Sequence, residues 1–242
     1  MSSKLPFPRT DREFMDMFPN EEACLEYSYK HNVQRFTAIL SCCAFPAMSP
    51  LYPMKEEIMH DGSLDKNTLS YGLSKRVVAI QIENYNKEFG TKYNYVTPCN
   101  IYGISNKIGE NKGHFITDLI NKIKLANKNG DDKIKLFGDG TPIRQLIYAC
   151  DLARVIKIMI EKDITDSFNI AADETLTIND IVKIALRVTD SEHLNIVYDT
   201  NKPNGQPRKD LNIEKFRKIL PEYKCTPIVE GLRIYYEAVK NK

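Results

Sequence analysis

RFTAILSCCAFP, at residues 35–46, and YGLSK, at residues 71–75, are the stretches that decide the fold we predict. The first opens as a short β-rich run that leads directly into Ser41. The second lies in a long helical pattern over residues 67–89, which Gly90 ends as a typical C-cap. A strand followed by a long helix is the repeating unit of α/β proteins, so these two stretches predict a parallel sheet covered by helices.

The rest of the chain continues this alternation. Strand patterns are expected at 93–97, 133–137, 167–171 and 194–198, and helical patterns at 20–30, 115–126, 151–161, 178–188, 213–220 and 228–240. Asn20 and Thr177 stand where N-caps are expected, at the starts of the first and fourth of these helices. The segments 42–66 and 99–113 are irregular, and each follows a predicted strand. Because ligands of open α/β sheets bind beyond the carboxyl ends of strands, we expect function in these loops.

Composition excludes several classes of protein. The chain has 242 residues, a formal net charge of +2, 42% hydrophobic residues and 27% charged residues. This describes a globular protein with a substantial core and no basic footprint for nucleic acid. Apolar runs are too short for a membrane span, and residues 1–6 lack a signal-peptide core, so we expect a cytoplasmic protein. Six cysteines without a C-x-x-C pair are expected to be reduced thiols, with no metal site.

The residue types in the two opening stretches point to acid–base chemistry. Tyr71 and Lys75 are four residues apart, so a helix places them on one face. An ammonium beside a phenol favours the phenolate, which predicts a lowered pKa for Tyr71. The Ser41 hydroxyl, at a strand end, is expected to hold the same substrate oxygen. Together these groups suit reduction of a ketone beside a nicotinamide, although a Tyr–Lys pair alone is more often an ordinary surface pair.

Four more motifs recur in a fixed order. They are S-C-C-A-F-P at 41–46, P-C-N-I-Y-G at 98–103, G-T-P-I-R at 140–144 and K-P-N-G-Q-P-R-K at 202–209. With Y-x-x-x-K, they resemble the extended short-chain dehydrogenases of the NAD-dependent epimerase/dehydratase family, in its GDP-L-fucose synthase branch. The resemblance runs from Leu25 to the C-terminus, but Gln145-Leu146 stands where that branch usually has Glu-Phe. It implies a truncated Rossmann-like parallel sheet with a small C-terminal α/β substrate domain.

The resemblance also assigns catalytic roles. Ser41, Tyr71 and Lys75 would form the reductase triad, with Tyr71 and Lys75 also contacting the cofactor. Cys43 and His114 would be the epimerisation pair, which removes and returns protons beside the keto group. A C–H next to a carbonyl is acidic enough for a thiolate base, and an imidazolium can supply the opposite proton. The alternatives are that Cys43 is a small apolar residue and that His114 is a surface or capping residue.

Further residues would bind the nucleotide sugar. The resemblance implies that Arg144, Arg208 and Lys209 hold the diphosphate of GDP, since guanidinium groups offer paired donors to phosphate oxygens. Asn100 would hydrogen-bond the substrate near the reacting atoms. Alternatively, the three basic side chains lie on a turn and a loop and are simply solvated.

The segment before Ser41 departs from the family. The resemblance implies NADP(H), whose pyrophosphate needs a glycine-rich turn at a helix N-terminus, and no such string occurs in the sequence. We therefore divide the chain into an atypical segment, 1–27, and a partial dehydrogenase domain, 28–242. Residues 14–27 resemble the opening of some insertion-sequence transposases, which suggests a fusion; an ordinary amphipathic helix is the alternative.

Two functions follow as expectations. The first is an NADP-dependent epimerase-reductase of a GDP-4-keto-6-deoxy sugar or of another GDP-sugar. The second is a non-catalytic remnant that binds a sugar nucleotide, whereas a DNA-associated role would rest on the first segment alone.

A sheet that starts with the strand before Ser41 has an unpaired edge, so we expect a homodimer or a complementing partner chain, and no nucleic-acid or membrane partner.

Overall fold

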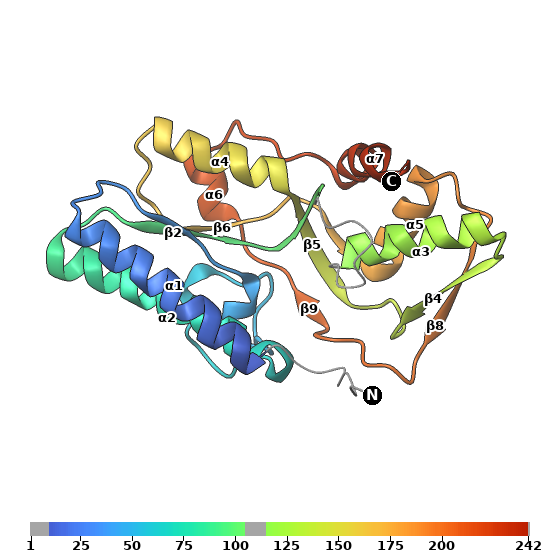
Figure 1. Ribbon diagram of the computed structural model, residues 1–242, viewed down its shortest axis with the longest axis horizontal. Coiled ribbons are helices and arrows are strands. Elements are labelled where there is room, and N and C mark those ends of the chain that lie inside the picture. The colour runs from blue at the N-terminus through green and yellow to red at the C-terminus, as the bar shows by residue number, and fades with distance from the viewer. Residues whose placement is uncertain (1–9, 105–114, 242) are drawn as a thin grey trace. The chain divides into compact units, whose positions relative to one another are not determined.

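The computed structural model describes residues 10–104 and 115–241, with side chains from residue 20 onward. The chain divides into two compact units, each assembled from separated segments (Figure 1). The first unit comprises Met1–Cys99, Val155–Ile170 and Leu211–Pro221, and the second comprises Asn100–Arg154, Ala171–Asp210 and Glu222–Lys242. Each unit is built from helices and mainly parallel strands, which confirms the predicted α/β class.

The first unit is organised around a three-stranded parallel sheet. Its strands, in spatial order, are β1 (Thr37–Ile39), β2 (Asn94–Pro98) and β6 (Phe168–Ile170). Every residue of β2 is buried, which explains why its sequence does not alternate. Among the described strands, β1 is an outer strand of this sheet, and Ile39 at its end is 43% exposed. Because all strands are parallel, their carboxyl ends share one edge, where Ser41 follows β1.

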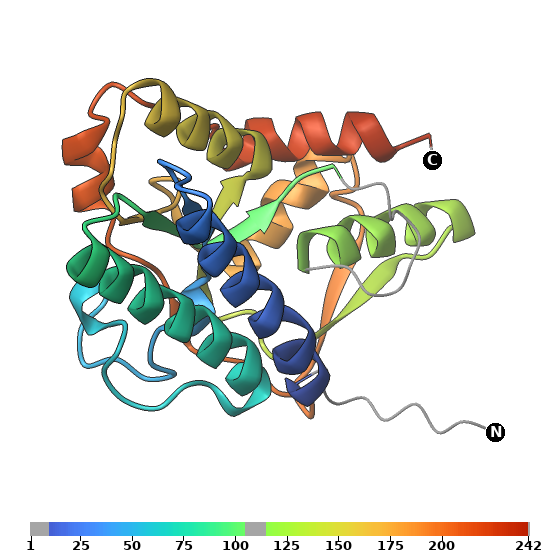
Figure 2. The same cartoon turned by 60° about the vertical axis from the view of Figure 1, so that its left-hand side comes forward.

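Two long helices pack side by side in this unit, as both views show (Figure 2). They are α1 (Thr10–Lys30) and α2 (Leu69–Phe89), and α2 ends at Gly90 in the left-handed conformation, as predicted. The prediction that Asn20 caps the first helix is wrong, because α1 begins at Thr10. The helix continues through Pro19, which lacks a backbone donor and which we therefore expected to precede a helix start.

Short elements complete the first unit. Three 3₁₀ turns, η1 (Cys42–Ala44), η2 (Glu56–Ile58) and η3 (Lys66–Thr68), lie between β1 and α2. Near the C-terminus, α6 (Glu214–Ile219) packs on β6, where Phe216 stacks on Phe168 with ring centroids 5.7 Å apart. The end of α4 (Ala149–Glu161), from Val155, also belongs to this unit. The sequence order of the main elements therefore agrees with the predicted one.

The second unit contains two small sheets. In the first, β5 (Ile143–Tyr148) lies between β3 (Asn100–Tyr102) and β7 (Thr175–Thr177), and β9 (Arg208–Lys209) also pairs with β5. In the second, β4 (Lys133–Phe137) pairs in parallel with β8 (Asn195–Asp199). The prediction of an irregular segment at 99–113 is therefore wrong at β3, whose three residues are strand only because β5 pairs with them.

Three helices enclose the core of the second unit. They are α3 (Phe115–Asn129), α5 (Ile178–Val188) and α7 (Ile228–Val239). Their apolar faces meet in one cluster that includes Ile120, Ile181 and Leu232, each 0% exposed. Thr177 caps α5 as predicted, in a reciprocal capping box with Asp180. Within the described ranges, no helix is both long and apolar enough to cross a bilayer.

Candidate active site

Ser41 lies in the first unit, directly after the outer strand β1 of the parallel sheet. Its backbone is extended, with φ −155° and ψ 148°, and it serves as the N-cap of η1. The Ser41 Oγ accepts a hydrogen bond from the backbone N–H of Cys43 at 3.2 Å. The chain thus turns at the carboxyl end of β1, where the Ser41 hydroxyl and the half-buried Cys43 thiol are two residues apart.

Helix α2 brings Tyr71 to this turn. The phenol of Tyr71 lies close enough to the hydroxyl of Ser41 for a side-chain hydrogen bond that lowers the Tyr71 pKa. Close approach of the helix depends on Gly72, because a Cβ there would overlap the carbonyl oxygen of Cys43. The small residue next to the tyrosine therefore sets the distance between α2 and η1, and with it the Ser41–Tyr71 contact.

Lys75 lies one helical turn after Tyr71 and is buried. Its Nζ lies 5.8 Å from the centroid of the Tyr71 ring and donates to the carbonyl oxygen of Ile39 at 3.0 Å. It also forms an ion pair with Glu21 of α1, which is 54 residues away in sequence. The predicted triad of Ser41, Tyr71 and Lys75 is therefore brought together, and Glu21 joins it.

Glu21 was missed by the sequence analysis, and no local signal marked it. It stands beside Glu22 in a helical pattern where both carboxylates fit an exposed first turn. Glu22 is exposed, whereas the Glu21 side chain is 25% exposed and faces Lys75. Only the packing of α1 against α2 distinguishes these two residues.

The pKa of Tyr71 is raised above its ordinary value, so the predicted lowering is wrong. Burial of the phenol is the main cause, and the charges of Cys43, Cys42 and Glu21 act in the same direction. The hydrogen bond with Ser41 acts in the opposite direction. Since Lys75 is paired with Glu21, its positive charge is offset and does not lower the Tyr71 pKa below its ordinary value.

Arg76 fixes the loop that follows the Ser41 turn. Its Nε donates to the carbonyl oxygen of Ala44 at 2.8 Å, and its Nη1 donates to that of Gly62 at 3.2 Å. Burial lowers the pKa of Arg76, with Asp61 opposing the effect. One guanidinium on α2 thus joins η1 to the loop before η3, and both of these segments are tied to the same helix.

The predicted epimerisation pair is only partly described. Cys43 is half-buried in η1 and the neighbouring Cys42 is buried. Both thiols are close enough to Tyr71 to raise its pKa, so the two differ in exposure alone. His114 lies outside the described residues.

The predicted nucleotide-binding residues lie in the second unit. Asn100 begins β3, opposite Leu146 of β5. In β5, Arg144 is the register partner of Lys209 in β9, and Ile143 is that of Arg208. The side chain of Arg144 donates to the Ile143 carbonyl oxygen at 2.7 Å. Pairing of these two strands brings together the basic residues of two motifs that are far apart in sequence.

Arg208 is held by a carboxylate. Its Nε and Nη2 donate to the two carboxylate oxygens of Asp210 at 3.0 Å and 2.6 Å. The Asp210 side chain is 2% exposed, whereas that of Arg208 is 39% exposed. This bidentate pair anchors the end of β9, next to Lys209 and its register partner Arg144.

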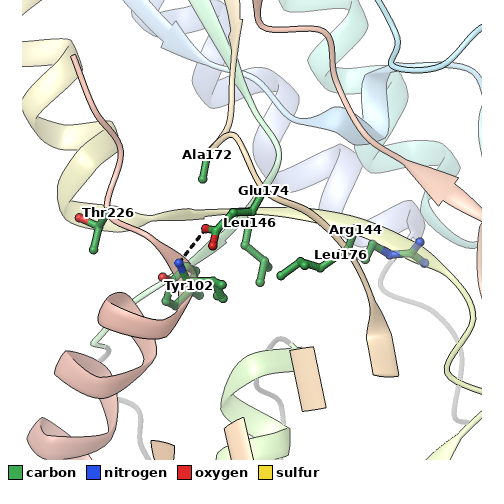
Figure 3. A pocket seen from close by; sticks show the side chains of 8 residues that line it. Tyr102, Arg144, Leu146, Ala172, Glu174, Leu176 and Thr226 are labelled. Carbon is green, nitrogen blue, oxygen red and sulfur yellow. Dashed lines mark hydrogen bonds between the residues drawn. The ribbon is translucent and has the colours of Figure 1, made fainter. Parts of the chain in front are cut away.

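A small cavity in the second unit lies beside these residues (Figure 3). Its lining includes Tyr102, Arg144 and Glu174, and the Glu174 carboxylate accepts the backbone N–H of Ile228 at 2.8 Å. The guanidinium of Arg144 extends away from Tyr102 in this view. The volume is about 10 Å³, which is about room for one water molecule and too small for a nucleotide.

A larger cavity of about 530 Å³ lies in the first unit. Its lining includes Arg35, Tyr93 and other residues that follow α1 and α2 and lead into β1 and β2. Its lining contains none of the predicted site residues that the structure describes. It opens at the amino ends of these strands, the edge opposite to Ser41, where α/β proteins do not usually bind ligands.

The fold and the site together have a Rossmann-like arrangement: a hydroxyl after a parallel strand lies near a tyrosine and a lysine on the following helix. Comparison with known protein families identifies the family of the chain. The profile of the family described as "NAD dependent epimerase/dehydratase family" matches residues 18–171. The chain belongs to this family.

Two curated relatives are similar to the chain in sequence. The GDP-L-fucose synthase of Dictyostelium discoideum is 30% identical over 225 residues, which cover 92% of this chain and 68% of the relative. The GDP-L-colitose synthase of Yersinia pseudotuberculosis is 30% identical over 183 residues, which cover 74% of this chain and 58% of the relative. The chain thus spans about two thirds of the length of the curated relatives it matches.

Solved structures share the fold. A GDP-L-fucose synthetase from Naegleria fowleri, bound to NADP, superposes with a TM-score of 0.83 at 24% identity, covering 93% of this chain and 71% of that one. A GDP-6-OMe-4-keto-L-xylo-heptose reductase from C. jejuni gives a TM-score of 0.85 at 19% identity, covering 99% and 81%. At these identities the likeness establishes the Rossmann-like architecture.

Proposed function

We propose that this chain carries the acid–base residues of an epimerase-reductase that acts on a GDP-linked 4-keto-6-deoxy sugar. The observation that carries the proposal is the meeting of Ser41, Tyr71 and Lys75, with Cys43 on the same turn as Ser41. The names of the Dictyostelium and Yersinia relatives support the substrate class.

Tyr71 acts as the general acid in the reduction. The pKa of its buried phenol is raised above an ordinary value that already lies well above neutral pH, so the proton-donating form is present at neutral pH. NADPH, when bound, supplies the hydride. The Tyr71 Oη gives its proton to the carbonyl oxygen of the sugar, while the Ser41 hydroxyl donates a second hydrogen bond to that oxygen. Both hydroxyls lie at the same turn, so the ketone oxygen can exchange their mutual hydrogen bond for one hydrogen bond from each of them.

The described residues fit the end of the cofactor where hydride is transferred. Tyr71 and Lys75 present donors at the carboxyl end of β1, where a nicotinamide would lie beside the ketone. The sequence contains no G-x-x-G-x-x-G or G-x-G-x-x-G string, so we assign none of the described residues to the pyrophosphate.

Cys43 serves as the base for epimerisation. Its thiolate removes a proton from the carbon next to the keto group, and the electron pair moves to the carbonyl oxygen as an enolate. The Ser41 and Tyr71 hydroxyls stabilise that oxygen. We assign return of a proton to the opposite face to His114.

Arg144 and Lys209 hold the diphosphate of GDP. Their strands pair in register, so two cations converge from separate motifs. Arg208 contributes through its bidentate pair with Asp210, which fixes the end of β9. Asn100 binds the sugar.

Hydrogen–deuterium exchange tests the proposal without requiring NADPH. A GDP-4-keto-6-deoxyhexose is incubated with the protein in D₂O, and deuterium at the carbons beside the ketone is followed by NMR. Cys43→Ala is expected to abolish exchange, whereas Cys42→Ala, its neighbour, retains it. Equal exchange in the two variants contradicts the role of Cys43. Absence of exchange in the parent protein, with GDP still bound, favours the non-catalytic alternative.

NADPH absorbance then tests the reduction. The parent protein is expected to consume NADPH in the presence of the keto sugar, and Tyr71→Phe is expected to lose about 100-fold or more of that rate. Parallel assays with other GDP-4-keto sugars define which sugar is preferred.

A further inference from the structure

The ion pair between Glu21 and Lys75 adds a residue that the motif does not contain. The Lys75 side chain is 8% exposed, and a buried ammonium without a counter-charge is costly to the folded state. Its neighbours are the Glu21 carboxylate, the Ile39 carbonyl oxygen and the Tyr71 ring. Glu21 is the residue among these three that carries a full negative charge.

The carboxylate is held close to the site by packing. Glu21 projects from α1 toward α2, while the neighbouring Leu25, one turn later, is 1% exposed in the core. The second oxygen of Glu21, Oε2, is shielded from solvent and accepts no hydrogen bond from any described residue. Shielding from water strengthens the field of this carboxylate at the nearby phenol.

We propose that Glu21 is a positioning residue of this site: its carboxylate fixes the Lys75 ammonium against β1 and offsets the positive charge that the ammonium presents to Tyr71. This inference rests on the proposed function of Tyr71 as a proton donor. A lone ammonium at this place would favour the phenolate, which can accept a proton but cannot donate one. The Glu21–Lys75 pair therefore extends the proton-donating form of Tyr71 to higher pH.

The other groups that face the phenol are consistent with this role. Cys42 and Cys43 come from η1, Ser41 precedes them, and Lys75 comes from α2 itself. Of these, only Lys75 carries a permanent positive charge. Removal of the Glu21 charge thus leaves one uncompensated cation near Tyr71.

The test measures the pKa of Tyr71 directly, without substrate or cofactor. Protein labelled with ¹³C at tyrosine Cζ is titrated by NMR, and Tyr71→Phe identifies the resonance. Glu21→Gln is expected to lower the Tyr71 pKa by about one unit or more, whereas Glu22→Gln, an exposed matched control on the same helix, leaves it unchanged. An unchanged Tyr71 pKa in a folded Glu21→Gln protein overturns the proposal.

A second variant covers the case in which Glu21→Gln does not fold. Replacing both partners by methionine, Glu21→Met with Lys75→Met, removes the two charges together and leaves an apolar pair of similar size. If the charges offset each other, the Tyr71 pKa of this double variant stays near that of the parent protein. A shift of more than about one unit contradicts the offset.

Activity measurements separate this proposal from the proposed function. If the parent protein is active, Glu21→Gln is expected to move the alkaline limb of the pH profile of reduction to lower pH. The thermal midpoint of the variant is measured separately, because it can change without this shift. If the parent protein shows no turnover but the Tyr71 pKa falls in Glu21→Gln, the positioning role stands and the proposed function fails. If the parent protein shows turnover but the Tyr71 pKa is unchanged in Glu21→Gln, the proposed function stands and the positioning role fails.

Discussion

Gly72 on α2 lies so close to η1 that a Cβ atom on it would overlap the carbonyl oxygen of Cys43 and lie 3.1 Å from its carbonyl carbon. The obstacle is backbone rather than a flexible side chain, so it cannot rotate away. This contact sets the spacing between the helix that carries Tyr71 and the turn that carries Ser41.

Gly72→Ala is therefore expected to push α2 away from η1. We expect a loss of about 1–3 kcal/mol in the free energy of unfolding, the usual effect of overpacking, together with loss of the proton exchange described above. Urea unfolding and deuterium incorporation measure the two effects. Leu73→Ala, at a side chain that is 41% exposed, is the control and should change neither. Full exchange in Gly72→Ala would show that the close contact is dispensable.

Reduction is expected to depend on pH through Tyr71. The folded pKa of Tyr71 is raised by burial, so the acid form is present below that pKa and is lost as the pH rises through it. The rate should therefore have a plateau around neutral pH and an alkaline limb, measured from initial rates of NADPH consumption. If the rate falls near neutral pH instead, the Lys75 charge outweighs burial in setting the Tyr71 pKa.

Ser41→Ala tests the second donor at the same oxygen. Loss of one hydrogen bond to the developing oxyanion is expected to lower the rate about 100-fold. Because the Ser41 hydrogen bond lowers the Tyr71 pKa, its removal should also move the alkaline limb to higher pH. Ser41→Thr, which keeps the hydroxyl, is the matched control; a rate equal to that of Ser41→Ala would argue against a role for the hydroxyl.

The basic residues of β5 and β9 are expected to differ in their effects. Arg144→Ala and Lys209→Ala should weaken GDP binding about 10-fold to 100-fold, since a hydrogen bond to a charged group contributes about 1.5–3 kcal/mol. Arg208→Ala should instead lower stability by about 1–2 kcal/mol, because it leaves the buried Asp210 carboxylate without its partner.

Isothermal titration with GDP and urea unfolding measure these two quantities. Lys133→Ala, an exposed cation on β4, serves as the control for a change in net charge. If Arg208→Ala weakens GDP binding as strongly as Arg144→Ala and leaves stability unchanged, the anchoring role of the Arg208–Asp210 pair is wrong.

The capping box of α5 gives a prediction for stability alone. Thr177→Ala removes the side chain that accepts the Asp180 N–H at 3.1 Å and should cost about 1 kcal/mol. Hydrogen bonds from Thr177 lower the pKa of Asp180, so this contribution is present above the unfolded pKa of the carboxyl and is lost as the pH falls through the folded value. Urea unfolding at neutral and acidic pH checks both statements, with the exposed Thr175→Ala as the control.

Much of the secondary structure could be predicted because its signals are local. The strand at Lys133–Phe137, the helix at Ile178–Val188 with its Thr177 cap, and the end of α2 at Gly90 agree with the structure. The strand β5 was not predicted, because Ile143–Tyr148 becomes a strand by pairing with β3, β7 and β9, which come from distant segments. Such pairing leaves little trace in the sequence of one strand.

The sequence by itself determined that Tyr71 and Lys75 share a helix face and that Ser41 follows a strand, because helical spacing and the order of strand and helix are properties of neighbouring residues. Only the tertiary structure decided which carboxylate forms the ion pair with Lys75. Glu21 and Glu22 are chemically identical and adjacent, and the packing of α1 on α2 buries one beside the ammonium while the other faces water. The charge state of the phenol therefore depends on a contact between residues 54 positions apart, which no local pattern specifies.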